Sequence, residues 1–182
     1  MNIKEALILA YNDLSPYSDS KRWEFFNNLK SLEFFISYIP PGMSVLDIGS
    51  GIGIFALALS KLGYNVVGLD KYIFQSDNYL SVEKIGLERL QKIWQKNSLS
   101  IINADVFDFL SDKKFDCVVN IAVLEHQKSP KKFIESCLKH LKYNGYFFCV
   151  VPNMVDLLNR MRVLFGRSAC RDLKPFFEAG EN

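Results

Sequence analysis

The stretch VLDIGSGIGIFALALSKLGYNVVGLDKY, from Val45 to Tyr72, decides how the rest of the sequence is interpreted. Residues 45–49 form a short apolar run typical of a buried strand, and residues 53–63 are small and favour a helix. Residues 65–70 again favour a strand, which ends on Asp70. The stretch therefore predicts two strands and an intervening helix, with a glycine-rich turn after the first strand.

The same alternation extends to both sides. A helix is predicted before Pro40, with an apolar stripe at Phe25, Leu29, Leu32, Ile36 and Ile39. Another is predicted over residues 78–97, with Leu87, Leu90, Ile93 and Trp94 on one face. Strands follow at 98–105, 115–124 and 145–153. Ser129 and Pro130 begin a helix that carries Phe133, Ile134, Leu138 and Leu141 inward, and a last helix has a stripe of Met154, Leu158, Met161 and Phe165.

This order predicts an α/β fold: a Rossmann-like, doubly wound, mostly parallel sheet of five strands with helices on both faces, preceded by N-terminal helices. We expect one domain over residues 1–182. Residues 1–41 would form a helical cap and residues 42–152 a cofactor-binding core. Residues 153–182 would form a C-terminal helix and an irregular tail.

Composition indicates a globular protein without a charged partner. The 182 residues are 49% hydrophobic and 23% charged, and the net charge of +2 favours neither nucleic acid nor an acidic membrane. The N-terminal apolar run is too interrupted for a signal peptide, so we expect a cytoplasmic protein. Four scattered cysteines, Cys117, Cys137, Cys149 and Cys170, predict reduced thiols and no metal site.

The glycine turn suits a cofactor, and two cofactors compete for it. Gly51, Gly53 and Ala56 satisfy the GxGxxA form of a dinucleotide fingerprint, with Asp70 placed for a ribose hydroxyl. Asp47 argues against a dinucleotide, because a carboxylate at the end of the first strand would repel a pyrophosphate. The same carboxylate suits a ligand that carries an ammonium group. A turn that merely lets the chain change direction is the alternative without a ligand.

The motifs together resemble the class I S-adenosylmethionine-dependent methyltransferases. The resemblance rests on LDIGSGIG from residue 46, GLD ending at residue 70, NAD ending at residue 105, FDCVVNIAVLEH ending at residue 126, and GYFFCVVPN. It covers residues 42–165. The LEH triplet and the VPN segment are more similar to the branch that acts on small molecules and glycans. The resemblance implies in-line transfer of a methyl group to such an acceptor.

The resemblance also implies a set of donor-binding residues. Asp47 and the glycines of the turn match the residues that hold the methionine part, and Asp70 matches the acid that binds the ribose hydroxyls. Lys71 and Tyr72 are candidates to lie against the adenine. The complete set is Asp47, Gly49, Gly51, Gly53, Asp70, Lys71, Asp105, Val106 and Asn120.

Several of these positions have simpler alternatives. Asp70 could instead cap a helix or lie in a solvated turn, and Asp105, matched to the adenine amino group beside the Val106 N–H, could instead cap a short turn. At Asn120, which ends the fourth strand, we expect the backbone carbonyl rather than the side chain to serve the donor.

No catalytic residue is assigned from the sequence. His126 is near enough to the fourth strand to act as a base, but it could, with Glu125, only fix the following loop. His140, in a lysine-rich helix, is expected at the surface. Tyr11, Tyr17 and Trp23 either line an acceptor pocket or belong to the core of the leading helices.

The chain departs from the family pattern at its end, where the two strands that usually follow the fifth are not predicted. Either the sequence is a fragment, or the fifth strand is covered by the last helix or by a partner, which makes this edge or helix a candidate for self-association. A basic cluster here is either a solvated face or an anion-binding surface; it comprises Arg160, Arg162, Arg167, Arg171 and Lys174. An inactive methyltransferase-like module and a dinucleotide-dependent oxidoreductase are the competing functions.

Overall fold

The computed structural model describes residues 1–14, 22–71, 84–153 and 157–166, without the side chains of residues 22–24, 84, 85, 157–159 and 162. The chain order is α1 (Ile3–Leu14), α2 (Arg22–Tyr38), β1 (Ser44–Ile48), α3 (Ile54–Lys61), β2 (Asn65–Leu69), α4 (Lys84–Lys96), β3 (Ser100–Ile102), β4 (Phe115–Ile121), the 3-10 helix η3 (Leu124–His126), α5 (Pro130–Leu138), β5 (Leu141–Val150) and α6 (Leu157–Leu164).

The strands form one parallel sheet in the order β3-β2-β1-β4-β5. The chain first winds outward from β1 to β3 and then returns to the other side of β1 with β4 and β5. The topology therefore switches between β1 and β4, and the carboxyl ends of these two strands flank the usual ligand position of such a sheet. The predicted α/β class with five strands is confirmed.

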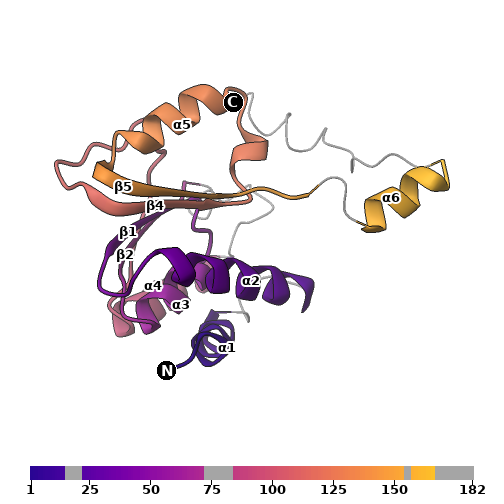
Figure 1. Ribbon diagram of the computed structural model, residues 1–182. Coiled ribbons are helices and arrows are strands. Elements are labelled where there is room, and N and C mark those ends of the chain that lie inside the picture. Colours follow the sequence, from indigo (N-terminus) through magenta and orange to yellow (C-terminus); the bar gives the residue numbers. More distant parts are fainter. Residues whose placement is uncertain (15–21, 72–83, 154–156, 167–182) are drawn as a thin grey trace.

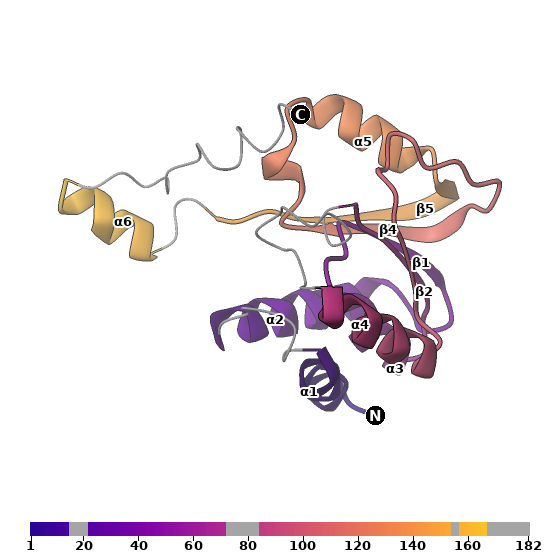
Figure 2. The same ribbon diagram turned by 180° about the vertical axis from the view of Figure 1, so that it is seen from behind.

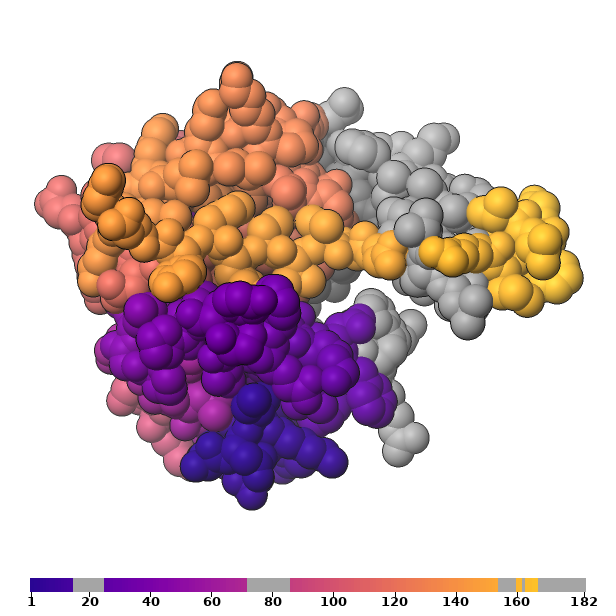
Figure 3. All heavy atoms as spheres, in the orientation of Figure 1, coloured from indigo at the N-terminus to yellow at the C-terminus, as the bar shows by residue number. Residues whose placement is uncertain are grey.

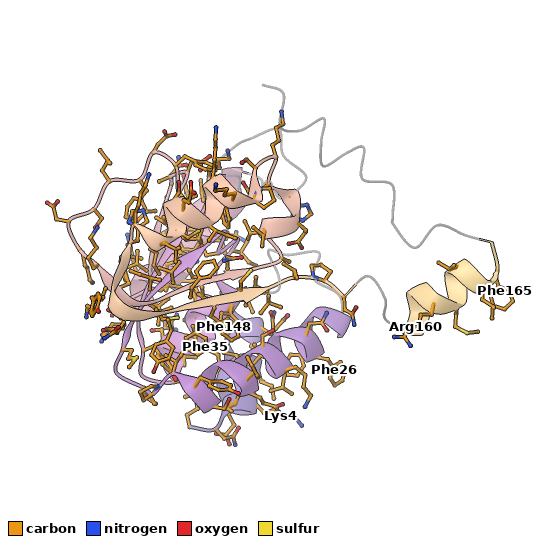
Figure 4. The ribbon with its side chains drawn as sticks, turned by 45° about the horizontal axis from the view of Figure 1, so that its top comes forward. Lys4, Phe26, Phe35, Phe148, Arg160 and Phe165 are labelled. Carbon is orange, nitrogen blue, oxygen red and sulfur yellow. The ribbon has the colours of Figure 1, made fainter. Side chains whose placement is uncertain are left out.

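Helices cover both faces of the sheet (Figures 1 and 2), with α5 on one face and α1 to α4 on the other. The larger core lies between the sheet and α1 to α4, where Leu32 and Phe35 of α2 are fully buried. Phe35 packs edge-on against Phe148 of β5 with ring centroids 5.1 Å apart (Figure 4). Every residue of α3 from Ile54 to Leu59 is buried, because α1 covers the outer side of this helix. The predicted stripes of α2 and α4 thus face the core.

Several boundary and burial predictions are wrong. Strand β3 is only three residues long, β4 ends at Ile121 instead of 124, and β5 runs from Leu141 to Val150 instead of from 145 to 153. Helix α5 consequently ends at Leu138, whose side chain is 46% exposed and not inward. His140 is 5% exposed, not at the surface, and its ring lies 5.2 Å from that of Phe109. It is buried because it lies between α5 and β5, where the chain turns into the sheet.

Helix α6 stands away from the sheet in both ribbon views (Figures 1 and 2). Its described residues Met161 and Phe165, predicted to share an apolar stripe, are 42% and 71% exposed. The predicted members Met154 and Leu158 lie outside the described side chains. Within the described ranges, no strand follows β5, which therefore forms an edge of the sheet.

Candidate functional site

The glycine turn is held by hydrogen bonds from its own backbone. The N–H groups of Gly49 and Ser50 both donate to the Leu69 carbonyl, at 2.8 and 3.1 Å, which joins the turn to the end of β2. The Gly53 N–H donates to the Ser50 carbonyl at 3.0 Å, and α3 begins directly after it. The predicted turn between β1 and α3 is confirmed, and it lies at the carboxyl edge of the sheet.

Each glycine of the turn has a positive φ, but the space around each differs. A Cβ atom at Gly49 (φ 75°) would clash with Val123, and one at Gly53 (φ 90°) would come within 2.5 Å of Ile101. A Cβ atom at Gly51 (φ 54°) would meet nothing within 4 Å. Gly49 and Gly53 therefore allow neighbouring segments to pack closely, whereas Gly51 borders open space that a ligand can occupy.

Asp47 is a buried carboxyl group with an unsatisfied oxygen. It lies near the end of β1, opposite Gly68 and Val119, and is 3% exposed. Its Oδ2 atom accepts no hydrogen bond from any described residue. Burial, and secondarily the charge of Asp70, raises the pKa of this carboxyl to about 7. A ligand with an ammonium group would supply the missing partner and favour the ionised form.

Asp70 is tied directly to the glycine turn. It is 5% exposed, and its Oδ2 atom accepts the Gly51 N–H at 2.8 Å. Its own N–H donates to the Ile102 carbonyl at 3.1 Å, so the backbone that carries it is fixed to β3. The carboxylate is thus held beside the open space at Gly51, which excludes the alternative of a solvated turn.

Lys71 and Asp105 form an ion pair across the ends of β2 and β3, with 2.6 Å between Nζ and Oδ2. The other oxygen of Asp105 accepts the Phe107 N–H at 3.1 Å, so the carboxylate also caps the turn, as its alternative interpretation predicts. Val106, which follows, is 6% exposed. These residues lie at the same edge as the glycine turn. Tyr72 lies outside the described residues.

Asn120 is fully buried near the end of β4. Its Oδ1 atom accepts the Cys149 thiol proton at 3.2 Å, and its Nδ2 atom has no partner among the described residues. Val119 is in register with Asp47, so strand alternation places the Asn120 side chain on the opposite face from Asp47. This geometry agrees with the expectation that the backbone of Asn120, and not its side chain, faces the donor.

The segment after β4 lies against the glycine turn through the contact of Val123 with Gly49. It continues into η3, where Glu125 and His126 have 25% and 34% exposed side chains and 3.9 Å between Oε1 and Nε2. Their loop is therefore adjacent to the candidate donor site.

Tyr11 supports the core alternative, because its ring packs on Phe25 with centroids 5.3 Å apart and its hydroxyl accepts a bond from Asn28 at 2.9 Å. Tyr17 and the Trp23 side chain lie outside the described part of the chain. Cys117 and Cys137 are buried and Cys149 is half-buried, all as free thiols, and Cys170 lies outside the description. Of the basic cluster, only the side chain of Arg160 is described, and it is exposed on α6 (Figure 4).

Two site residues were not predicted from the sequence. The side chain of Ser50, within the turn, packs so closely on β2 that a Cβ atom on Gly68 would come within 2.6 Å of its Oγ atom. Trp94, predicted only as a core residue, donates its indole N–H to the Ile52 carbonyl of the turn at 3.0 Å. The glycine at position 68, unusual inside a strand, was the available signal for the first residue. The sequence contains no local signal for the role of Trp94, because its contact with Ile52 joins residues 42 positions apart.

Comparison with known families gives a methyltransferase-domain model that matches residues 21–175. The chain belongs to this methyltransferase family. The resemblance to class I S-adenosylmethionine-dependent methyltransferases is thereby confirmed, and the dinucleotide oxidoreductase is set aside.

Similar proteins are found among curated sequences, and similar folds among solved structures. The mitochondrial ubiquinone biosynthesis O-methyltransferase of Dictyostelium discoideum is 32% identical over 123 residues, which are 64% of this chain but 37% of that protein. The PH0226 protein of Pyrococcus horikoshii has a similar structure, with a TM-score of 0.58, 22% identity, and coverage of 86% of this chain and 68% of that one. The glycopeptide N-methyltransferase MtfA, solved with S-adenosylmethionine, gives a TM-score of 0.51 at 20% identity, covering 66% of this chain and 52% of that one.

No group of three or more potential metal ligands occurs among the described residues. No helix within these residues is long and apolar enough to cross a membrane.

Proposed function

We propose that this chain binds S-adenosylmethionine and transfers its methyl group to a small-molecule acceptor. The observation that carries the proposal is the buried Asp47 carboxyl, whose unsatisfied oxygen lies at the carboxyl edge of the sheet beside a glycine turn. S-adenosylmethionine has an ammonium group for this carboxyl and no phosphate that would be repelled. The family membership and the donor bound by MtfA support the same cofactor.

The donor supplies a sulfonium centre whose methyl group is already activated for displacement. The roles proposed for the protein are to bind and orient. Asp47 would take the amino group, Gly51 would leave room for the methionine part, and Asp70 would accept the two ribose hydroxyls. Lys71, Asp105 and Val106 would border the adenine. Holding donor and acceptor in line can supply most of the rate enhancement.

The names of the relatives indicate which kind of methyl acceptor to propose for this chain. Curated relatives are O-methyltransferases of ubiquinone biosynthesis, which favours a hydroxyl on a small molecule, and MtfA keeps a glycan-bearing or amine acceptor open. A hydroxyl nucleophile needs a base, and the pair of Glu125 and His126 lies in the loop against the glycine turn. His126 is therefore our candidate base. This proposal also retains the expected cytoplasmic location. It retains the division of the chain into a helical cap over residues 1–41, a cofactor-binding core over residues 42–152 and a C-terminal part over residues 153–182.

The first test is isothermal titration with S-adenosylhomocysteine, the demethylated product. Micromolar binding, about 8 kcal/mol, together with no response to NADH, is expected. Asp70→Asn keeps an acceptor for the Gly51 N–H but loses the charge that binds both ribose hydroxyls, so it should abolish measurable binding. Asp108→Asn, an exposed change in the neighbouring loop, is the matched control.

Unchanged affinity of the Asp70→Asn variant would contradict the assigned site. Binding without turnover of any phenol, catechol or amine acceptor would favour the inactive module. No binding by a folded wild-type sample would contradict the proposed function itself.

We further propose that β5 is covered by β5 of a second copy. Within the described part of the chain, β5 has no neighbouring strand on its outer side, and it crosses the front of the molecule between α5 and α2 (Figure 3). Tyr146 on this strand is 44% exposed, and Phe34 and Tyr38 of α2 are 57% and 61% exposed. The one charged residue of β5, Lys142, is neutralised by Asp116 at 2.8 Å, so the edge carries no net charge to keep copies apart. Light scattering should give a dimer that Tyr146→Lys converts to a monomer; a monomeric wild type would contradict the pairing.

A further inference from the structure

Trp94 lies where a distant helix meets the glycine turn. It belongs to the last turns of α4, is 3% exposed, and donates its indole N–H to the Ile52 carbonyl at 3.0 Å. Its own carbonyl accepts the Leu99 N–H at 2.9 Å, at the start of the segment that becomes β3. The side chain of Trp94 is therefore hydrogen-bonded to the glycine turn, and its backbone carbonyl is hydrogen-bonded to the segment between α4 and β3.

The Ile52 carbonyl, which accepts this bond, lies within the glycine turn. Ile52 lies between Gly51, whose N–H is bound by Asp70, and Gly53, where α3 begins. Among the described residues, the other hydrogen bonds of the turn are made within its own backbone, to Leu69 of β2 or to Asp70 directly after that strand. Glycines have the least intrinsic conformational restraint, so residues 51–53 need external contacts to hold one geometry. Trp94 supplies such a contact from outside the βαβ unit.

The packing around Gly53 points to the same function. A Cβ atom on Gly53 would come within 2.5 Å of Ile101 and 3.5 Å of the Trp94 Nε1 atom. The turn is thus packed against β3 and α4, and the indole N–H donates to a carbonyl that this close approach partly buries. A partly buried carbonyl that loses its donor is left less well satisfied, so the turn would shift if the donor were removed.

We propose that Trp94 is a positioning residue for the donor site, which it serves by fixing the glycine turn through the Ile52 carbonyl. It acts through residues 51–53 and does not touch the donor. The inference rests on the proposed binding of S-adenosylmethionine. It assigns a role in donor affinity to a residue of α4 that lies outside every motif of the sequence.

The test compares two variants that each remove one buried side-chain donor to a backbone carbonyl. Trp94→Phe removes the bond to Ile52. Tyr64→Phe removes the bond from the Tyr64 hydroxyl to the Ile39 carbonyl, at the opposite end of the strands. Tyr64 is 4% exposed and Trp94 is 3% exposed, so the two donor side chains are similarly buried. Both variants should lose stability to urea. Only Trp94→Phe should weaken S-adenosylhomocysteine binding, by about 3- to 10-fold, the usual range for one hydrogen bond.

A second replacement separates the hydrogen bond from the volume of the ring. Benzothienylalanine at position 94 keeps the bicyclic shape but has sulfur in place of the N–H group, so it should weaken binding to the same extent as Trp94→Phe. It also covers the case in which the phenylalanine variant fails to fold. In a Trp23→Phe background, Trp94 is the sole tryptophan, and its emission should shift on addition of S-adenosylhomocysteine.

Wild-type affinity in both Trp94 replacements would overturn the inference, as would an equal loss in Tyr64→Phe, which would indicate a general effect of stability. These results leave the proposed function intact, since the wild type still binds. A folded wild type that does not bind S-adenosylhomocysteine would instead contradict the proposed function and, with it, this role of Trp94.

Discussion

Replacing Asp47 with asparagine should stabilise the free protein and abolish donor binding. Burial, with a smaller contribution from the charge of Asp70, raises the pKa of Asp47 from its ordinary 3.8 to about 7. Between these two pH values the folded chain holds a proton that the unfolded chain has lost. Stability therefore falls as the pH rises through this window, and the full cost of the buried charge remains above pH 7.

The size of this cost follows from the two pKa values. A rise from 3.8 to about 7, at about 1.4 kcal/mol for each pH unit, corresponds to a cost of up to about 4 kcal/mol at pH 8. An asparagine side chain at this position would be neutral at every pH and nearly the same size. The Asp47→Asn variant should therefore exceed the wild type in unfolding free energy by up to about 4 kcal/mol at pH 8, and the difference should shrink as the pH approaches 4.

Urea unfolding at several pH values, together with titration of S-adenosylhomocysteine, measures both effects. Asp116→Asn is the matched control with the opposite sign. Hydrogen bonds from Lys142 and Ser44 lower the pKa of Asp116, so its neutralisation should destabilise the chain. An Asp47→Asn variant that is less stable than the wild type at pH 8, or that binds the product with wild-type affinity, would refute the reasoning.

Three further predictions concern the turn, the donor and His140. Gly51→Ala and Gly42→Ala place a Cβ atom at φ 54° and 90°, each with nothing within 4 Å, so both should cost about 1 kcal/mol in unfolding free energy. Only Gly51→Ala should weaken S-adenosylhomocysteine binding. Equal affinities of the two variants would contradict the proposal that the ligand occupies the space beside Gly51. Because the ammonium group requires ionised Asp47, affinity in calorimetry should fall about tenfold for each pH unit below 7, and a flat profile would argue against this pairing. Burial and the charges of Lys114 and Lys139 lower the pKa of His140, so the chain should lose stability as the pH falls below 6.5. The His140→Phe variant should lose less stability over this range, as measured by urea unfolding. An unchanged dependence of stability on pH would assign the loss to other groups.

Local patterns in the sequence were sufficient for the order of the elements. Alternating apolar runs and helical stripes predict the βαβ unit around residues 45–70, because burial on two faces requires them. They are poor guides to boundaries. Strand β5 begins four residues early because pairing with β4 extends from Leu141, although Asn144 and Gly145 favour a turn. Long-range pairing outweighs such local preferences.

In the candidate site, too, the positions of residues were predicted better than their contacts. Asp47, the glycines and Asp70 were predicted because a parallel sheet gathers its βα turns at one edge, so their sequence positions already imply their neighbourhood. Lys71 and Asp105, which are predicted to lie near the adenine, were placed at that edge too, but their ion pair was not predicted. His140 was misplaced because its lysine-rich neighbours suggest a surface, whereas the turn into β5 buries it.

Fold class, family and the place of the glycine turn could be predicted from the order of the residues, since these depend on periodicity and on glycines that take positive φ. Packing in three dimensions was needed to show that Asp47 is an unsatisfied buried acid, that the Asn120 side chain lies on the opposite face of the sheet from Asp47, and that Trp94 of α4 donates a hydrogen bond to the turn. Burial and contacts between distant segments come from how the elements pack together, and no local pattern of residues records them.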